Sequence, residues 1–332
     1  MAVYIIAEAG VNHNGRLDLA LRLCDVAKAA GVDAVKFQTW KTEKIVTQTA
    51  AKATYQVENT HSNEETQFDM LKKLELSYRQ FFEIKEYCDK IGIEFLSTPD
   101  EEDSLNFLVD LHLPVLKIGS GEVTNIPYLR RIGSKHLPVI LSTGMSYLSD
   151  VETAYRTLLK AGAKSVSLLH CTTNYPCPMS EVNLRAMQTL KDAFHCVVGY
   201  SDHTMGIEIP IAAAAMGAEI IEKHFTLDKE MDGPDHKASL NPEELKQMVM
   251  AIRNIERALG NGIKQPNESE KQISEVVLKR IVAATPIKKG EVLSADNMTV
   301  KRSTVGLKAS LWDLVNGRIA TCNYAIDEPI II

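Results

Sequence analysis

The sequence lacks the patterns that mark several classes of protein. Its six cysteines show no C-x-x-C spacing, and in a chain of 332 residues we interpret them as reduced thiols rather than a disulfide framework. The chain starts with a strand-length apolar run that lacks the basic segment of a signal peptide. The most apolar later stretch, residues 207–221, is too short to cross a bilayer. We therefore expect a cytoplasmic protein with no membrane partner.

Neither sign of charge is in large excess. The formal net charge of -6 provides no basic surface for nucleic acid, so we expect no nucleic-acid partner. Hydrophobic residues make up 45% of the chain and charged residues 24%, which is ordinary for a soluble globular protein. An anionic small molecule could still bind to such a protein at a local cluster of cations.

The sequence does contain a repeat of about eight short apolar runs, each of which ends in polar or charged residues. Continuous apolar runs are typical of buried parallel strands. Functional groups at the carboxyl ends of eight such strands indicate a (β/α)8 barrel, which is the α/β fold that we predict. The runs cover residues 3–10, 34–39, 94–99, 115–122, 139–144, 166–172, 197–204 and 219–226.

Helical patterns separate these runs, as expected for βαβ units. Several of the helices begin with a cap residue and a partner three positions later. The pairs are Ser77 with Gln80, Ser149 with Glu152, and Asn241 with Glu244. The long interval of residues 40–76 is polar and irregular, and we predict that part of it is a loop covering the active site.

The pattern of residue types changes after the last of these predicted helices. Glycines and a polar stretch indicate a linker, and short strand-like pieces among turns follow it. We predict a barrel domain over residues 1–260, a linker over 261–279 and a small, mostly β domain over 280–332.

Two lysines within apolar strands, Lys36 and Lys117, are unusual because lysine is almost never fully buried unless it is paired. One interpretation is that each pairs with a carboxylate such as Glu8. A second is a site for phosphate and carboxylate groups, whose oxygens need several donors such as the hydroxyls at the strand ends. A third is a lysine that forms a Schiff base.

His203 and His224 end the last two runs, so a barrel would place them side by side. Such a pair can hold a divalent metal with open positions, and Asp202, Glu222 and Asp235 are near in sequence. The alternative is a hydrogen-bonded structural role for each histidine. No H-E-x-x-H motif is present, which argues against zinc hydrolase chemistry.

Taken in order, these strand ends resemble the sialic acid synthase family, including bacterial synthases of N-acetylneuraminic and N,N'-diacetyllegionaminic acid. The resemblance covers essentially the whole chain and includes a C-terminal stretch similar to the antifreeze-like (SAF) domain of these enzymes. The matching segments are AEAGVNHNG, VKFQT, FLSTP, KIGSGE, LSTGM, LLHCTTNYP, GYSDHT, EKHFTLD, GPDHKAS and IKKGEVLSADNMTVKR.

The resemblance implies a role for each matching residue. His203 and His224 would ligate Mn²⁺ or Mg²⁺. The residues implied to hold phosphoenolpyruvate are Lys36, Thr98, Lys117, Ser120, Ser142 and Ser201. The residues implied to face the sugar and a reacting water are Glu8, Gln38, Glu122, Tyr175 and Asp235. We assign catalytic roles to Glu8, Lys117, Glu222 and Asp235, and we add Thr173 to the substrate-binding set.

The resemblance also implies a homodimer in which Arg302 of one chain reaches the N-acyl group of the sugar in its partner. The implied reaction condenses phosphoenolpyruvate with an N-acetylated hexosamine and releases phosphate by C–O cleavage. Three departures from the family pattern affect the distal part of the sugar site and the Arg302 loop: Asp100, Thr173 and the segment 303–306.

Three other functions stay open at this point. The first is a related phosphoenolpyruvate-dependent synthase of seven-carbon or eight-carbon keto acids. The second is an aldolase that forms a Schiff base at Lys117 or Lys36. The third is a non-catalytic protein that binds sugar or ice, suggested by the antifreeze-like segment. The full set of polar groups at the strand ends favours an enzyme.

Overall fold

The computed structural model describes residues 2–60 and 65–331. The chain divides into two compact units, Met1–Gly260 and Asn261–Ile332, each with its own hydrophobic core. Among the described helices, none is both long enough and apolar enough to cross a membrane.

The first unit is built on an eight-stranded parallel sheet with the order β3-β2-β1-β8-β7-β6-β5-β4. Strands β3 and β4 lie side by side although no ladder joins them, so the sheet curves into the predicted barrel. The strands are β1 (Tyr4–Gly10), β2 (Ala34–Thr39), β3 (Glu94–Pro99), β4 (Leu116–Ile118), β5 (Pro138–Ser142), β6 (Ser165–Cys171), β7 (Val198–Asp202) and β8 (Ile220–His224).

The fourth strand is shorter than predicted. It ends at Ile118, and residues Ser120–Glu122 form a 3-10 turn instead of continuing the strand. Leu116 and Ile118 face the helices, so Lys117 between them faces the interior of the barrel.

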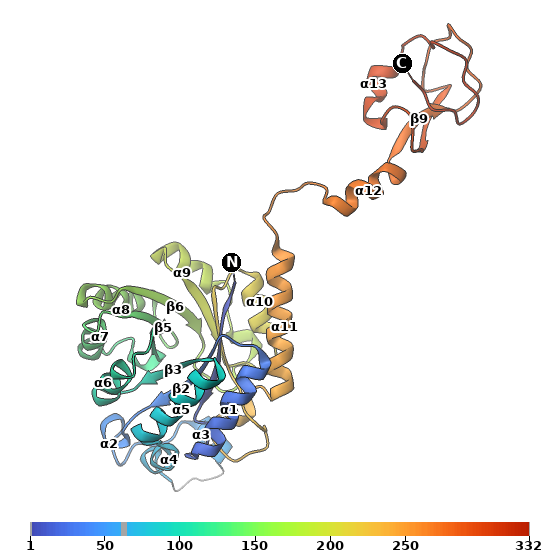
Figure 1. The fold of residues 1–332 in the computed structure, drawn as a ribbon. Coiled ribbons are helices and arrows are strands. Elements are labelled where there is room, and N and C mark those ends of the chain that lie inside the picture. Colours follow the sequence, from blue (N-terminus) through green and yellow to red (C-terminus); the bar gives the residue numbers. More distant parts are fainter. Residues whose placement is uncertain (1, 61–64, 332) are drawn as a thin grey trace. The chain divides into compact units, whose positions relative to one another are not determined.

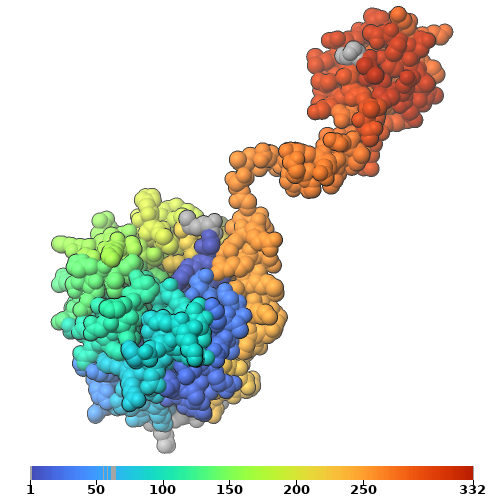
Figure 2. Space-filling model, viewed as in Figure 1, coloured from blue at the N-terminus to red at the C-terminus, as the bar shows by residue number. Residues whose placement is uncertain are grey.

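Helices follow the strands and cover the outside of the sheet (Figure 1). They are α1 (Leu17–Ala30), α5 (Tyr78–Ile91), α6 (Glu102–Asp110), α7 (Ile126–Gly133), α8 (Leu148–Ala161), α9 (Ala186–Phe194), α10 (Glu208–Ala215) and α11 (Pro242–Leu259). In the space-filling view of Figure 2, α11 lies on the outer surface of this unit, where it packs against α1 and α10.

Two of the three predicted capping boxes are confirmed, at Ser77 before α5 and at Asn241 before α11. The prediction of Ser149 with Glu152 is wrong. Helix α8 begins at Leu148, and the Asp150 carboxylate accepts a hydrogen bond of 2.9 Å from the backbone N–H of Tyr147. The cap therefore lies two residues earlier in the chain.

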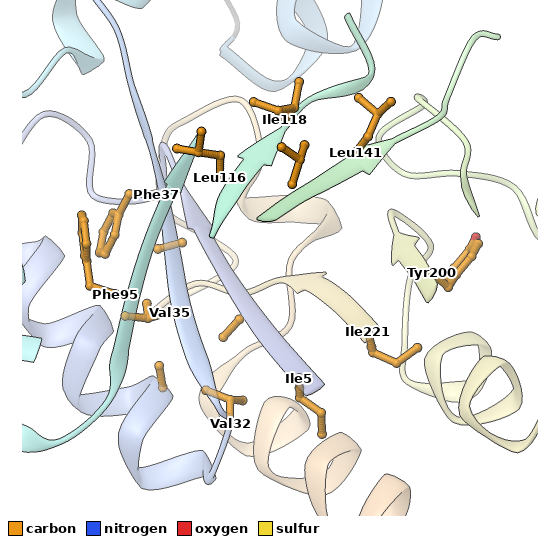
Figure 3. Close-up of a cluster of buried hydrophobic side chains, with 14 of the residues drawn as sticks. Ile5, Val32, Val35, Phe37, Phe95, Leu116, Ile118, Leu141, Tyr200 and Ile221 are labelled. Atoms are coloured by element: carbon orange, nitrogen blue, oxygen red, sulfur yellow. The ribbon is translucent and has the colours of Figure 1, made fainter. Parts of the chain in front are cut away.

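Alternate residues of each strand divide the core into two layers. One set packs under the helices, and Figure 3 shows Phe37 and Phe95 from β2 and β3 stacked in this layer. The other set points into the barrel and forms a small apolar plug of Ile6, Ala34, Leu96, Ile140, Leu169 and Ile220. Side chains on one face of a strand recur every two residues. Two residues further along the strands, the side chains that face inward are polar.

The described part of the interval of residues 40–76 contains three helices, which the irregular sequence did not predict. The expectation that part of this interval covers the active site stays a prediction. The helices are α2 (Thr42–Ile45), α3 (Thr54–Thr60) and α4 (Gln67–Leu74), and residues 61–64 lie outside the described residues. Trp40, Met70 and Leu74 pack with Val11 in a separate apolar cluster. This cluster stabilises a segment whose overall composition is polar.

The second unit begins with the segment that we predicted as a linker, which contains helix α12 (Glu268–Val277). An antiparallel pair follows, β9 (Lys279–Ala283) with β10 (Met298–Arg302), and then the short helix α13 (Trp312–Val315). Isolated β-bridges, such as that between Ile287 and Tyr324, connect the remaining turns. Its core includes Ile281, Leu293 and Val315.

Candidate active site

The inward polar residues line one pocket at the carboxyl ends of the barrel strands. Register pairing places Glu8 beside both Lys36 and His224, and Ser201 beside Glu222. The lining residues are Glu8, Lys36, Gln38, Thr98, Asp100, Lys117, Gly119, Ser120, Ser142, Cys171, Tyr175, Ser201, His203, Glu222 and His224. Most of the residues predicted from the strand ends are therefore brought together.

The two lysines lie in a buried network with two carboxylates. The Lys36 Nζ is 2.7 Å from the Glu8 Oε2 and 3.8 Å from the Glu222 Oε2. The Lys117 Nζ is 3.5 Å from the Glu222 Oε1. Each lysine is paired with a carboxyl group, as the first interpretation predicted.

Hydroxyl groups surround the same network. The Lys36 Nζ donates to the Thr98 Oγ1 at 3.1 Å, and the Lys117 Nζ donates to the Ser142 Oγ at 2.7 Å. The Ser201 hydroxyl donates to the Glu222 Oε1 at 3.0 Å. Cationic and hydroxyl donors that converge in this way suit the oxygens of an anionic ligand.

The environment shifts the pKa values of these groups in opposite directions. Burial raises the pKa of Glu8 to about 7, against the opposing charge of Lys36. Burial lowers the pKa of Lys117, whereas for Lys36 the effect of burial is outweighed by Glu222 and Glu8, which raise its pKa. Burial would raise the pKa of Glu222, but the two lysines hold it below its usual value. Glu8 is thus suited to exchange a proton near neutral pH.

His203 and His224 lie next to each other at the ends of β7 and β8, with ring centroids 5.4 Å apart. The His203 Nδ1 is 2.7 Å from the carbonyl oxygen of Thr172, which can only accept, so Nδ1 carries the proton and Nε2 is left as an electron-pair donor. The Nδ1 of His224 is buried without a hydrogen-bond partner. Burial lowers the pKa of His203 to about 4 and that of His224 well below its usual value, so both rings are neutral, as a metal ligand must be.

These features fit a divalent metal that takes two protein ligands. Within residues 2–60 and 65–331, no group of three or more His, Cys, Asp or Glu side chains is arranged to hold an ion. A metal at the two histidines would therefore keep positions open for oxygens of water or substrate.

Asp202, which we counted with the histidines, does not line the pocket. Its carboxylate forms a buried ion pair of 2.5 Å with Lys223. Lys223 was not among the residues predicted from the sequence. Its position next to Glu222 and His224, both of which face the pocket, was the available signal, because neighbours in a strand face opposite sides.

Asp235 lies in the loop after β8 and approaches the histidines, with its Oδ2 3.9 Å from the Nδ1 of His224. Burial raises the pKa of Asp235 to about 6. The loop is held on both sides: the Asn59 amide donates to the Pro234 carbonyl at 2.6 Å, and the Ser239 hydroxyl donates to the Asp235 carbonyl at 2.7 Å. Helix α3, which carries Asn59, thus stabilises the loop that positions Asp235.

Tyr175 and Gln38 complete the wall of the pocket. The Tyr175 ring lies against His203, with centroids 4.1 Å apart. The Gln38 amide donates to the Glu8 Oε1 at 3.1 Å. Thr173 is beside Gly144, where a Cβ would lie 2.3 Å from the Thr173 Oγ1, so a larger residue at position 144 would force the Thr173 side chain to shift.

Four predicted residues are not among the residues that line the pocket. Thr173 and Asp235 are described above, and the other two are Glu122 and Arg302. Glu122 is half-buried in the turn after β4, where it accepts a hydrogen bond of 2.6 Å from Asn125. Arg302 is exposed at the end of β10 in the second unit, so its contact with a sugar stays a prediction. Asp100 and Cys171 line the pocket, although we did not include them among the site residues.

Comparison with known proteins identifies the family. The NeuB family model matches residues 23–264, and the SAF domain model matches residues 280–330. The chain belongs to the NeuB family. It is 51% identical to the N,N'-diacetyllegionaminic acid synthase of Campylobacter jejuni over 98% of each chain, and 47% identical to that of Legionella pneumophila over 96% of this chain and 91% of the relative.

A solved structure from the family supports the same assignment. The N-acetylneuraminic acid synthetase of Leptospira borgpetersenii is 38% identical, with a TM-score of 0.72 over 83% of this chain and 91% of that one. This NeuB family protein is therefore an enzyme of the sialic and legionaminic acid synthase type, with a SAF domain after its barrel.

Proposed function

We propose that this enzyme condenses phosphoenolpyruvate with 2,4-diacetamido-2,4,6-trideoxymannose and water, forming N,N'-diacetyllegionaminic acid and phosphate. The observation that supports this sugar is the 51% identity over 98% of both chains to a protein named for that product. N-acetylmannosamine is the alternative sugar, since a structural relative is named for N-acetylneuraminic acid.

The lysine network is the proposed site for phosphoenolpyruvate. Lys36 and Lys117 are paired with Glu8 and Glu222 at 2.7 and 3.5 Å, and they can turn toward the phosphate and carboxylate when these enter. Ser120, Ser142 and Ser201 would add hydroxyl donors. Buried cations of this kind also stabilise the charge that develops on a departing phosphate.

The chemistry divides into two additions. Carbon 3 of phosphoenolpyruvate attacks the aldehyde carbon of the open-chain sugar, whose oxygen takes up a proton to become a hydroxyl. Positive character then develops at carbon 2, where a water adds. Glu8, with a pKa of about 7, or Asp235, with a pKa of about 6, accepts a proton from that water. The tetrahedral intermediate then releases phosphate as its C–O bond breaks and the keto group forms.

His203 and His224 are the proposed ligands of Mn²⁺ or Mg²⁺. An ion held there would supply Lewis-acid chemistry for the addition to the aldehyde. Tyr175 packs against His203 and fixes the orientation of its ring.

The second unit is proposed to serve the site of a partner chain. In this arrangement the enzyme is a homodimer, and Arg302 binds the N-acyl group of the sugar in the partner's barrel. The six free cysteines accord with a reducing, cytoplasmic location, which stays a prediction.

Phosphate release with each sugar, phosphoenolpyruvate and Mn²⁺ tests the proposal, followed by mass analysis of the product. Phosphoenolpyruvate labelled with ¹⁸O at the bridging oxygen adds a sharper test. C–O cleavage leaves the label in phosphate, whereas P–O cleavage leaves it in the keto acid. Turnover with neither sugar, or label in the keto acid, would contradict the proposal.

A Schiff-base aldolase is the second candidate, favoured by the burial that lowers the pKa of Lys117. Borohydride treatment in the presence of pyruvate separates the two functions. An aldolase gains the mass of a reduced adduct on a lysine, whereas the proposed synthase stays unmodified.

A further inference from the structure

Asp100 lines the pocket but has no role in the chemistry described above. It directly follows β3 and is half-buried. Within the described part of the chain, its carboxyl group forms no hydrogen bond or ion pair. The neighbouring Glu101 differs, because its carboxylate is occupied as the cap of α6 and accepts from the backbone N–H groups of Asp103 and Ser104 at 2.6 and 2.9 Å.

The backbone holds Asp100 in a fixed position. Its own N–H donates to the Thr39 carbonyl at 3.1 Å. The hydroxyl oxygen of Tyr128 lies 2.9 Å from the carbonyl oxygen of Pro99 and 3.0 Å from that of Glu101, on either side of Asp100. A rigid backbone with a side chain that has no protein partner is typical of a group positioned for a ligand.

The order of strands places Asp100 opposite the histidines. In the eight-stranded circle, β3 and β4 lie across the barrel from β7 and β8, which carry His203 and His224. The turn after β4 carries Glu122, whose charge acts together with burial to raise the pKa of Asp100 to about 7. A sugar bound with its aldehyde at the histidines, as proposed above, and extended across the barrel would bring its distal carbons to Asp100.

We propose that the Asp100 carboxyl group accepts a hydrogen bond from the donor on carbon 4 of the sugar, and that this contact makes the donor a requirement for efficient turnover. The inference rests on the proposed function and deepens it. The donor is an amide N–H in the diacetamido sugar and a hydroxyl in N-acetylmannosamine. A site that has a fixed polar group rejects a substrate without the matching donor, because the group is then left unpaired.

A cycle of substrate and enzyme changes tests this contact. The substrates are the diacetamido sugar and its analogue that carries hydrogen in place of the acetamido group at carbon 4. For the unmodified enzyme we expect kcat/KM to fall by about 10²–10⁴-fold with the analogue. For Asp100→Ala we expect a similar loss with the full substrate and little further loss with the analogue, while the KM for phosphoenolpyruvate is unchanged.

Two further variants sharpen the comparison. Asp100→Asn keeps an acceptor oxygen, so it should retain part of the preference for the full substrate. Asp103→Ala removes a nearby, partly exposed carboxylate that pairs with Lys41 and Lys44, and it should leave turnover of both sugars unaffected. Circular dichroism of each variant verifies the fold.

The outcomes distinguish the inference from the proposed function. If Asp100→Ala lowers kcat/KM by the same factor with the full substrate and with the analogue, the contact with carbon 4 is overturned. The proposed function then still stands. An Asp100→Ala variant that raises the KM for phosphoenolpyruvate equally with both sugars would also overturn it, since Asp100 would then act through the charge on Lys36. If the unmodified enzyme uses neither natural sugar, the proposed function fails and the inference falls with it.

Discussion

Lys223 and Asp202 form an ion pair with an Nζ–Oδ2 distance of 2.5 Å, and neither side chain is exposed to solvent. Each precedes one of the two histidines, Lys223 before His224 and Asp202 before His203. Asp202 also accepts from the backbone N–H and hydroxyl of Thr204, at 3.1 and 3.0 Å. The pair lies outside the pocket and connects the ends of β7 and β8, so it fixes the spacing of the histidines inside the pocket.

Replacement of Lys223 by methionine should be strongly destabilising. The change leaves the buried Asp202 carboxylate without its cation, which typically costs about 3–5 kcal/mol in the free energy of unfolding. Urea unfolding followed by circular dichroism measures the loss. Lys271→Met, which removes an exposed partner of Glu268, is the matched control and should change stability by less than about 0.5 kcal/mol. Equal effects of the two variants would show that burial of the pair contributes nothing.

Replacement of His203 by asparagine should abolish metal-dependent turnover and leave the fold intact. The change removes one of two proposed ligands, so Mn²⁺ binding, measured by electron paramagnetic resonance, should weaken by at least about tenfold. His112→Asn is the control, because His112 is exposed with a φ of 58° that asparagine tolerates. Retention of Mn²⁺ binding in His203→Asn would place the metal elsewhere.

The alternation of side chains between the two faces of a strand explains how much of this site could be predicted from the sequence. Lys36, Ser142 and Glu222 lie two residues beyond Ala34, Ile140 and Ile220 of the apolar plug, so the runs that predict strands also place them at the mouth of the barrel. The fold and most of the pocket follow from this pattern alone.

Other features depend on contacts that a sequence pattern does not contain. Asp100 comes after the end of β3, where the alternation of side chains no longer determines direction, and its backbone is held through contacts with Thr39 and Tyr128. The interval of residues 40–76 folds into helices because Trp40 and Met70 meet Val11 from a different loop. These relationships are tertiary, and composition alone indicated a loop.

Replacement of Arg302 by alanine should weaken use of the sugar and leave phosphoenolpyruvate binding unchanged. Lys301→Ala is the adjacent control, which removes an exposed partner of Asp327. Steady-state kinetics with each substrate varied in turn measures the effect. An unchanged KM and kcat for the sugar would contradict the assigned contact.

Mixed dimers test whether Arg302 acts on the partner's site. Subunits with Arg302→Ala are unfolded and refolded together with subunits that carry His203→Asn. If Arg302 acts across the dimer, half of the dimers regain one complete site, and activity returns to about a quarter of the unmodified level. If Arg302 acts within its own chain, every site keeps a defect, and the activity of the mixture does not rise above the average of the two variants measured separately.

Replacement of Asp100 by asparagine should stabilise the protein at high pH. Burial and Glu122 raise the pKa of Asp100 to about 7, so between about pH 4 and 7 the folded state keeps a proton that the unfolded chain releases. Stability therefore falls as the pH rises through this window, and asparagine removes that loss. We expect a gain of about 1 kcal/mol at pH 8 that disappears near pH 4, since the group is partly accessible.

Thermal unfolding at several pH values measures this gain, and Asp103→Asn is the control with the opposite sign. Lys44 and Lys41 lower the pKa of Asp103, so its charge favours the folded state and asparagine should give no gain at pH 8. A variant Asp100→Asn that is no more stable than the unmodified protein at pH 8 would contradict the pKa direction. A gain in stability together with a partial loss of the preference for the full substrate is the combination expected of a residue held for a ligand at the expense of the fold.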